Sequence, residues 1–397
     1  MMDSIWSRVW NWITFIESSI SLHKKVFTLT QHKPEKKSAL RVNKGVDKPA
    51  SFNPEAALHF QKGQPQLLLA DEYVDGIRAG NRTVLSKAIT LVESALPKHQ
   101  SIAQEVIEKC LPYTGNSIRM GITGVPGVGK STFIEALGSY LTSAGHKLAV
   151  LAIDPSSEKT KGSILGDKTR KAKLASDKID IIRPSPSAGS LGGVARKTKE
   201  IITLCEAAGF DTIIVETVGV GQSETAVHSM VDFFLLLMLA GAGDELQGIK
   251  RGIMEMADAL VINKADGDNI PKAELARQEY LNALHLFPPA ESGWSPTVKT
   301  CSSLNNTGIT EVWEEVLNYI RLTEDSGYFQ KRRQQQELRI FFESIGERLK
   351  NNFYNDPDVK SQLDNHKANI LQGKVSAYQA GNALLETYYN SIRKAKD

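Results

Sequence analysis

A glycine-rich octapeptide at residues 124–131 constrains this chain more than any other feature. It reads Gly-Val-Pro-Gly-Val-Gly-Lys-Ser and has the G-x-x-x-x-G-K-S form of a phosphate-binding loop. An apolar segment at 118–122 predicts a buried strand before it, and residues 132–141 carry the apolar spacing of a helix after it. This order forms an anion cradle, because backbone N–H groups and the helix dipole converge on it. We therefore expect a nucleotide at this loop.

The side chains of the loop have separate expected roles. Lys130 is expected to reach the β and γ phosphates and to stabilise charge during catalysis, and the Ser131 hydroxyl is expected to bind Mg²⁺. The glycines let the backbone approach the phosphates without a Cβ in the way. The residues expected to contact the nucleotide here are Gly124, Val125, Pro126, Gly127, Val128, Gly129, Lys130, Ser131 and Thr132.

The rest of the chain predicts an α/β P-loop NTPase fold with added helices. Its 397 residues suffice for one large domain and further segments. Apolar segments alternate with amphipathic ones over 118–322, which is typical of a mainly parallel sheet flanked by helices. Helical spacing predicts an N-terminal helical domain at 66–117 and a C-terminal helical arm at 323–397. Dimerisation is the functional option for this arm, and a solvated helix face is the alternative. The predicted strands are 118–123, 148–153, 179–183, 212–216, 232–239, 259–263 and 297–301.

Residues 1–65 are predicted to be an N-terminal extension and linker. The start combines apolar residues at helical spacing with three of the five tryptophans, and residues 31–56 have the composition of a flexible linker. The start carries Asp3 where a signal peptide needs positive charge, and no cleavage site follows. Three alternatives remain open for this segment: a helix packed on its own protein, an extension with no role, and a membrane-surface or partner-docking helix.

Composition narrows the class of partner and the location. The net charge of +3 gives no argument for nucleic acid. Cys110, Cys205 and Cys301 have neither disulfide nor zinc spacing, so we expect a reducing, cytoplasmic setting. The strongest apolar run, 233–240, suits a buried strand and is too short for a membrane span.

The tetrapeptide Asn-Lys-Ala-Asp at 263–266 directly follows a predicted strand and has the form of a guanine-reading motif. The Asp266 carboxylate can accept hydrogen bonds from N1–H and the 2-amino group of guanine, and adenine offers neither. Hydrogen bonds to charged groups contribute about 1.5–3 kcal/mol each, so GTP is predicted over ATP. Ser302, Ser303 and Leu304, after the last predicted strand, are expected to support the base with backbone N–H groups.

Two acidic residues end predicted strands beside the phosphate loop. Asp154 follows the strand at 148–153, and Glu216 closes the strand at 212–216. A single acid in such a place can be a helix cap or a surface charge. Two of them at neighbouring strand ends favour Mg²⁺, which prefers hard oxygen ligands.

Glu216 also opens a Glu-Thr-Val-Gly sequence, which has the D-x-x-G form of a nucleotide switch with Glu in place of Asp. The Gly219 N–H is expected to sense the γ-phosphate. Val220 stands where Ras-like proteins have the glutamine that positions water, and the nearest candidate is Gln222. We therefore predict slow intrinsic hydrolysis that a partner stimulates or gates.

Several long strings resemble the ArgK/MeaB family, the P-loop GTPases associated with methylmalonyl-CoA mutase. The resemblance covers about residues 70–350 and leaves out the first 60. The strings are DPSS at 154–157, GSILGDKTR at 162–170, RPSP at 183–186, GGVA at 192–195, ETVGVGQSE at 216–224 and GAGDELQGIKRG at 241–252. One departure is Glu-Lys-Thr-Lys at 158–161, where the family has a turn containing Pro or Gly.

The resemblance implies a homodimeric G-protein chaperone that serves an adenosylcobalamin-dependent acyl-CoA mutase. GTP binding and hydrolysis, with GDP as product, would be coupled to cofactor loading and to protection or reactivation of the mutase. By position, the resemblance implies metal ligation by Ser131, Asp154, Asp167 and Glu216. It also implies that the loop 241–252 signals to the mutase through Asp244, Gln247 and Lys250.

Three other functions remain as alternatives. A nickel-delivery GTPase for hydrogenase or urease shares the fold class, although such proteins carry a His-rich tract or Cys/His ligands and the eight histidines here are scattered. A kinase acting on a transport protein would need a phosphate acceptor and a transporter. A scaffold that holds GTP without turnover is the non-enzymatic option.

Overall fold

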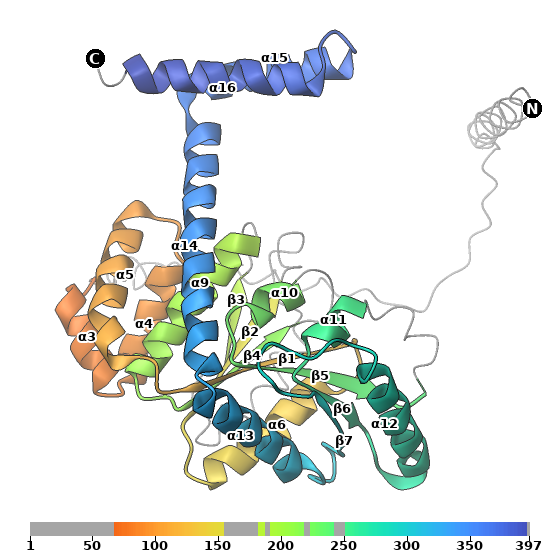
Figure 1. The fold of residues 1–397 in the computed structure, drawn as a ribbon. Coiled ribbons are helices and arrows are strands. Elements are labelled where there is room, and N and C mark those ends of the chain that lie inside the picture. Colours follow the sequence, from red (N-terminus) through yellow and green to blue (C-terminus); the bar gives the residue numbers. More distant parts are fainter. Residues whose placement is uncertain (1–66, 155–181, 187–190, 218–222, 242–250, 395–397) are drawn as a thin grey trace, which may run out of the picture. The chain divides into compact units, whose positions relative to one another are not determined.

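The computed structural model describes residues 67–154, 182–186, 191–217, 223–241 and 251–394 (Figure 1). The chain divides into two units, 1–66 and 67–397, and the description that follows concerns the second. The expected N-terminal extension lies outside the described residues.

The core of the second unit is a seven-stranded sheet in which every neighbouring pair is parallel. The strand order is β3-β2-β4-β1-β5-β6-β7, so the strand before the phosphate loop lies at the centre. The predicted α/β fold class is confirmed. The strands are β1 (Ile118–Gly124), β2 (Leu148–Asp154), β3 (Ile182–Pro186), β4 (Thr212–Thr217), β5 (Phe233–Leu239), β6 (Ala259–Asn263) and β7 (Thr297–Thr300).

The third strand differs from the prediction, which placed it at 179–183. The described strand runs Ile182–Pro186 and pairs with β2 from Ile182 opposite Val150 to Pro186 opposite Asp154. The apolar run before Arg183 suggested the earlier position. Two prolines are tolerated in β3 because it lies at the edge of the sheet and pairs only with β2.

Helices cover both faces of the sheet (Figure 1). Side chains alternate along β5: Phe233, Leu235 and Leu237 pack in the core with α6 and α13, whereas Leu236 and Met238 pack in the core with α12. The helices of this region are α6 (Lys130–Ser143), α9 (Leu191–Ala207), α10 (Ser223–His228), α11 (Arg251–Met256), α12 (Ile270–Leu284) and α13 (Ile309–Asp325), with a short 3₁₀ helix at Gly267–Asn269.

Three helices precede the sheet and pack on α9. Their apolar faces share one core with β2, β4 and α9, in which Ile77 and Ile89 are fully buried. Asn81 begins the second of these helices, and its side chain accepts hydrogen bonds from the N–H groups of Thr83 and Val84. The helices are α3 (Ala70–Arg78), α4 (Arg82–Glu93) and α5 (Pro97–Cys110), followed by a 3₁₀ helix at Leu111–Tyr113.

The chain ends in three helices: α14 (Tyr328–Asn355), α15 (Pro357–Leu371) and α16 (Ala377–Lys394). The long helix α14 packs along α9 and extends beyond it, and the pair α15 and α16 lies across its far end (Figure 1). Arg333 holds the first turns of α14 in place, because its guanidinium donates to both carboxylate oxygens of Asp232, at 2.8 and 2.6 Å. No helix among the described residues is long and apolar enough to cross a membrane.

Candidate nucleotide-binding site

The phosphate loop joins β1 to α6 through a backbone that requires glycine. Gly129 has a φ of +96°, and a Cβ there would lie 2.7 Å from Asn263 Nδ2. A Cβ on Gly124 would lie 2.5 Å from the carbonyl oxygen of Leu237 on β5. The loop therefore lies tightly against the ends of β5 and β6.

The Lys130 side chain folds back over the loop. Its ammonium group donates to the carbonyl oxygens of Gly124 at 2.7 Å and Val125 at 3.2 Å. Only 9% of the residue is exposed. The ammonium thus lies within the loop, in the position from which we propose that it meets the phosphates.

The predicted guanine motif is attached directly to the phosphate loop. Asn263 Nδ2 donates to the carbonyl oxygen of Val128 at 2.9 Å, and Lys264 Nζ donates to that of Gly127 at 2.8 Å. Lys264 adopts a φ of 60°, which is uncommon outside glycine and turns the chain away from the end of β6. The two motifs therefore form one connected site.

The segment after β7 supports the motif from the other side. The Ser302 hydroxyl donates to Asp266 Oδ2 at 2.6 Å, and the Ser303 hydroxyl donates to Asn263 Oδ1 at 2.7 Å. The Ser303 N–H also donates to Asn263 Oδ1, at 3.2 Å, whereas the Leu304 side chain is exposed. The structure thus shows the two serines positioning the motif, and a contact of their N–H groups with a base stays a prediction.

Two predicted metal ligands lie together beside the loop. The Ser131 hydroxyl is 3.4 Å from Glu216 Oε1, and Glu216 is buried at the end of β4. Asp154 ends β2, the strand next to β4, two residues beyond the position paired with Glu216. A hydroxyl and a buried carboxylate are the oxygen donors that Mg²⁺ prefers, so the residues present fit this ion.

Six predicted site residues lie outside the described part of the chain, and their roles remain predictions. They are Asp167, Gly219, Gln222, Asp244, Gln247 and Lys250.

A turn that was not predicted from the sequence follows β7, next to the guanine motif. Ser302 and Thr307 form an isolated antiparallel bridge, and Gly308 follows with a φ of +77°. A Cβ on Gly308 would lie 2.5 Å from the carbonyl oxygen of Thr300. The signal available in the sequence was the polar run ending in a glycine directly before a helix.

A seven-stranded parallel sheet with a phosphate loop after its central strand defines a P-loop nucleotide-binding protein. Residues 85–358 match the family described as "Methylmalonyl Co-A mutase-associated GTPase MeaB". The chain belongs to this family of GTPases, and the resemblance noted in its sequence is confirmed.

Relatives and a solved structure agree with this assignment. The chain is 48% identical to "GTPase ArgK" of Escherichia coli, over 80% of this chain and 98% of that protein. It is 43% identical to "Methylmalonic aciduria type A homolog, mitochondrial" of Mus musculus, over 80% and 79% of the respective chains. A crystal structure of a protein named "LAO/AO transport system kinase" matches with a TM-score of 0.64 and 38% identity, covering 81% of this chain and 99% of that one.

Proposed function

We propose that this protein is a GTP-hydrolysing switch that chaperones an adenosylcobalamin-dependent methylmalonyl-CoA mutase. The main support for the proposal is that the Asn263 and Lys264 side chains hydrogen-bond the guanine motif directly to the phosphate loop. The family description, which names association with the mutase, supports the choice of partner.

Recognition of GTP would divide between the two motifs. The loop N–H groups and the Lys130 ammonium would hold the phosphates and stabilise the charge that develops as the terminal phosphoryl group leaves. Asp266, oriented by the Ser302 hydroxyl, would accept hydrogen bonds from guanine. Adenine would leave the Asp266 carboxylate without these hydrogen bonds, which would disfavour ATP.

Mg²⁺ would be held by Ser131 and Glu216, with Asp154 and Asp167 as further ligands in the proposal. When bound, the ion would neutralise phosphate charge. Glu216 is well placed for this role because burial between strands fixes its carboxylate beside the Ser131 hydroxyl.

Intrinsic hydrolysis is proposed to be slow, because Val220 replaces the glutamine that positions water in Ras-like proteins. Gly219 and Gln222 would contribute to the step, and loss of the γ-phosphate would release the switch segments. The loop with Asp244, Gln247 and Lys250 would pass this change to the mutase.

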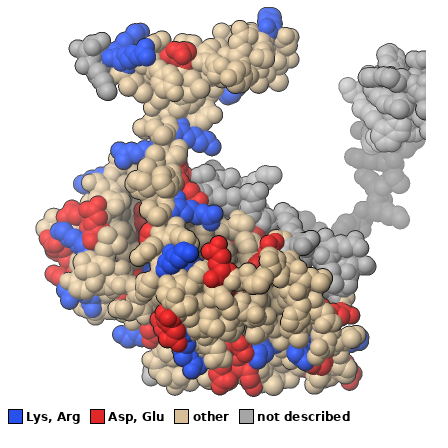
Figure 2. Space-filling view, viewed as in Figure 1, with Lys and Arg blue, Asp and Glu red and all other residues tan. Residues whose placement is uncertain are grey.

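The C-terminal arm is the proposed dimer interface. Helices α14 and α16 expose large apolar side chains, which are unusual on helices that contact only water. These residues are Leu338, Phe341, Phe342, Ile345, Leu349, Tyr378, Leu385 and Tyr389. Acidic and basic side chains are mixed on the visible face in Figure 2, which agrees with a protein partner and gives no support for nucleic acid.

The proposal can be tested with the full-length protein and purified methylmalonyl-CoA mutase. Complex formation is measured by size-exclusion chromatography with a non-hydrolysable GTP analogue and with GDP, and mutase inactivation is followed in parallel. Lys130→Ala should abolish nucleotide binding and mutase protection, whereas Lys331→Ala, an exposed lysine on α14, should change neither. A complex indifferent to nucleotide would contradict a switch.

The same experiment separates the alternatives. Protection that survives Lys130→Ala would favour a scaffold that does not depend on nucleotide. Transfer of the γ-phosphoryl group from GTP to a transport protein would favour a kinase, the activity in the name of the structurally similar protein. Tight Ni²⁺ binding by calorimetry would favour nickel delivery.

A further inference from the structure

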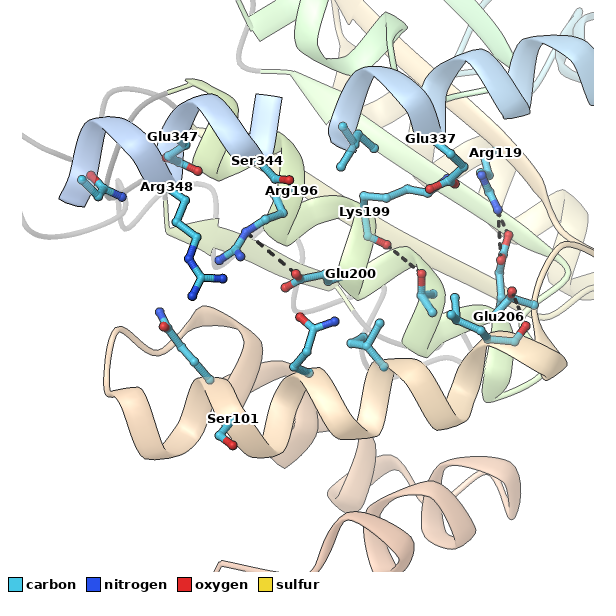
Figure 3. A pocket seen from close by; sticks show the side chains of 18 residues that line it. Ser101, Arg119, Arg196, Lys199, Glu200, Glu206, Glu337, Ser344, Glu347 and Arg348 are labelled. Atoms are coloured by element: carbon cyan, nitrogen blue, oxygen red, sulfur yellow. Dashed lines mark hydrogen bonds and ion pairs between the residues drawn. The ribbon is translucent and has the colours of Figure 1, made fainter. Parts of the chain in front are cut away.

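A cavity lies between α5, α9 and α14 (Figure 3), and no residue of the phosphate loop or the guanine motif lines it. Its volume of about 850 Å³ falls in the range of small-molecule sites. We call it the α9–α14 cavity. Its charged lining residues are Arg119, Arg196, Lys199, Glu200, Glu206, Glu337, Glu347 and Arg348.

Arg119 carries an unused donor at this cavity. Its Nε and Nη2 bind the two carboxylate oxygens of Glu206 at 2.8 and 3.1 Å, and only 5% of the residue is exposed. Its third nitrogen, Nη1, is buried and has no hydrogen-bond partner among the residues that the structure describes. Such a buried guanidinium nitrogen calls for an acceptor.

Further positive charge lines the cavity from two helices. Lys199 on α9 is buried and lies 2.6 Å from Glu337 on α14. Burial and the nearby Arg119 lower the pKa of Lys199, whereas Glu337 and Glu206 raise it. Figure 3 shows the Arg348 side chain pointing from α14 toward α5, which carries Ser101, and the Arg196 guanidinium beside the Glu200 carboxylate.

Two of the four carboxylates that line the cavity have close partners. Glu206 is held by Arg119, Ser117 and the Gly115 N–H, and Glu337 pairs with Lys199. Arg196 Nε lies 3.8 Å from Glu200, beyond hydrogen-bond distance, and has no hydrogen-bond partner in the described part of the chain. Arg119 Nη1 and Arg196 Nε therefore lack a hydrogen-bond acceptor among the described residues.

We propose that the α9–α14 cavity binds a small anion that carries a phosphate or carboxylate group. Arg196 and Arg348 would engage it at the opening, and Arg119 and Lys199 would supply positive potential from the interior. Guanidinium groups suit this role because their paired N–H donors match both oxyanions.

The cavity is lined by residues of two helices that pack on each other. Arg196 lies on α9, and Arg348 lies on α14, which leads into the rest of the C-terminal arm. The helices are already in contact there, since a Cβ on Gly193 would lie 2.8 Å from Glu347 Oε1. A bound anion would therefore add attraction between α9 and α14.

The test uses full-length protein saturated with GDP and Mg²⁺, so that the phosphate loop is occupied. Isothermal titration at constant ionic strength measures binding of inorganic phosphate in one arm and of succinate in the other. We expect saturable binding of at least one anion. The tighter of the two identifies the phosphoryl or the carboxylate class.

Arg348→Gln and Arg196→Gln should each weaken this binding about tenfold or more. Lys350→Gln removes the same charge from α14 but lies outside the cavity lining, and it should change the affinity less than twofold. Absence of saturable binding of both anions overturns the proposal, as does equal weakening by Lys350→Gln. GDP affinity, measured in the same samples, reports separately on the phosphate loop.

Discussion

Asn263 Nδ2 donates to the carbonyl oxygen of Val128 over 2.9 Å, so the first residue of the guanine motif also holds the phosphate loop in place. The Asn263 Oδ1 atom in turn accepts from the N–H and hydroxyl of Ser303. All three residues are buried. One amide side chain thus links the phosphate loop to the segment after β7 that is predicted to support the base.

Asn263→Ala should weaken GTP and GDP binding to a similar degree. The substitution leaves the Val128 carbonyl and the Ser303 donors without a partner, at a cost of about 1–3 kcal/mol. We expect a loss of about tenfold to a hundredfold in affinity, measured with a fluorescent GDP analogue. Asn282→Ala, an exposed change on α12, is the control. Unchanged affinity for both nucleotides would show that the link has no energetic role.

Asp266→Asn should change which base is bound. The amide cannot accept from both guanine donors, and losing two charge-assisted bonds of about 1.5–3 kcal/mol each predicts a fall in GTP affinity of a hundredfold or more. Its new N–H donor fits the 2-oxo group of xanthine, so binding of xanthosine triphosphate should improve. Asp268→Asn, on an exposed neighbour, should alter neither. Retained GTP preference in the Asp266 variant would refute the assigned role.

The sequence predicted those parts of the site that local pattern determines. The phosphate loop follows β1 because glycine spacing and an apolar strand can be read directly, and six strands were placed within one or two residues. The third strand was misplaced because Pro184 and Pro186 are poor strand signals and only its edge position makes them tolerable.

Contacts across the fold could not be predicted in the same way. The hydrogen bond from Lys264 to Gly127 joins residues 137 positions apart, and its existence depends on β5 lying between β1 and β6. The α9–α14 cavity also arises only when helices distant in sequence pack together. Periodicity carries no information about such pairings.

His228 should make stability depend on pH. Burial, together with Arg332 and Arg339 on α14, lowers the pKa of its imidazole to about 3, against an ordinary value of 6.5. Between these two pH values the unfolded chain binds more protons than the folded chain. The contribution of His228 to the free energy of unfolding is therefore fully present above pH 6.5 and is lost as the pH falls. The loss should reach at most about 2 kcal/mol at pH 5.

Urea unfolding at pH 7 and pH 5 measures this effect. His228→Gln should remove part of the acid destabilisation, because glutamine stays neutral in both states. His285→Gln, which changes an exposed histidine, should leave the difference between the two pH values as it is in the natural protein. Identical pH dependence in the His228 variant would argue against an uncharged imidazole at this position.

Phe342→Glu tests the arm as a dimer interface. The Phe341 and Phe342 rings are adjacent, with centroids 5.3 Å apart, and are 54% and 67% exposed although they are large and apolar. Burying a Phe side chain stabilises an interface by about 1.5–3 kcal/mol, whereas burying an unpaired carboxylate opposes association. We therefore expect light scattering to show a dimer for the natural chain and a monomer for Phe342→Glu.

Gln334→Glu, which adds the same charge at an exposed position near the base of α14, should remain dimeric. The thermal midpoint of the monomeric variant should fall only with the loss of dimerisation, because this ring contributes little to the protomer's own core. A natural chain that is monomeric at all concentrations would leave the exposed apolar side chains of α14 to another partner.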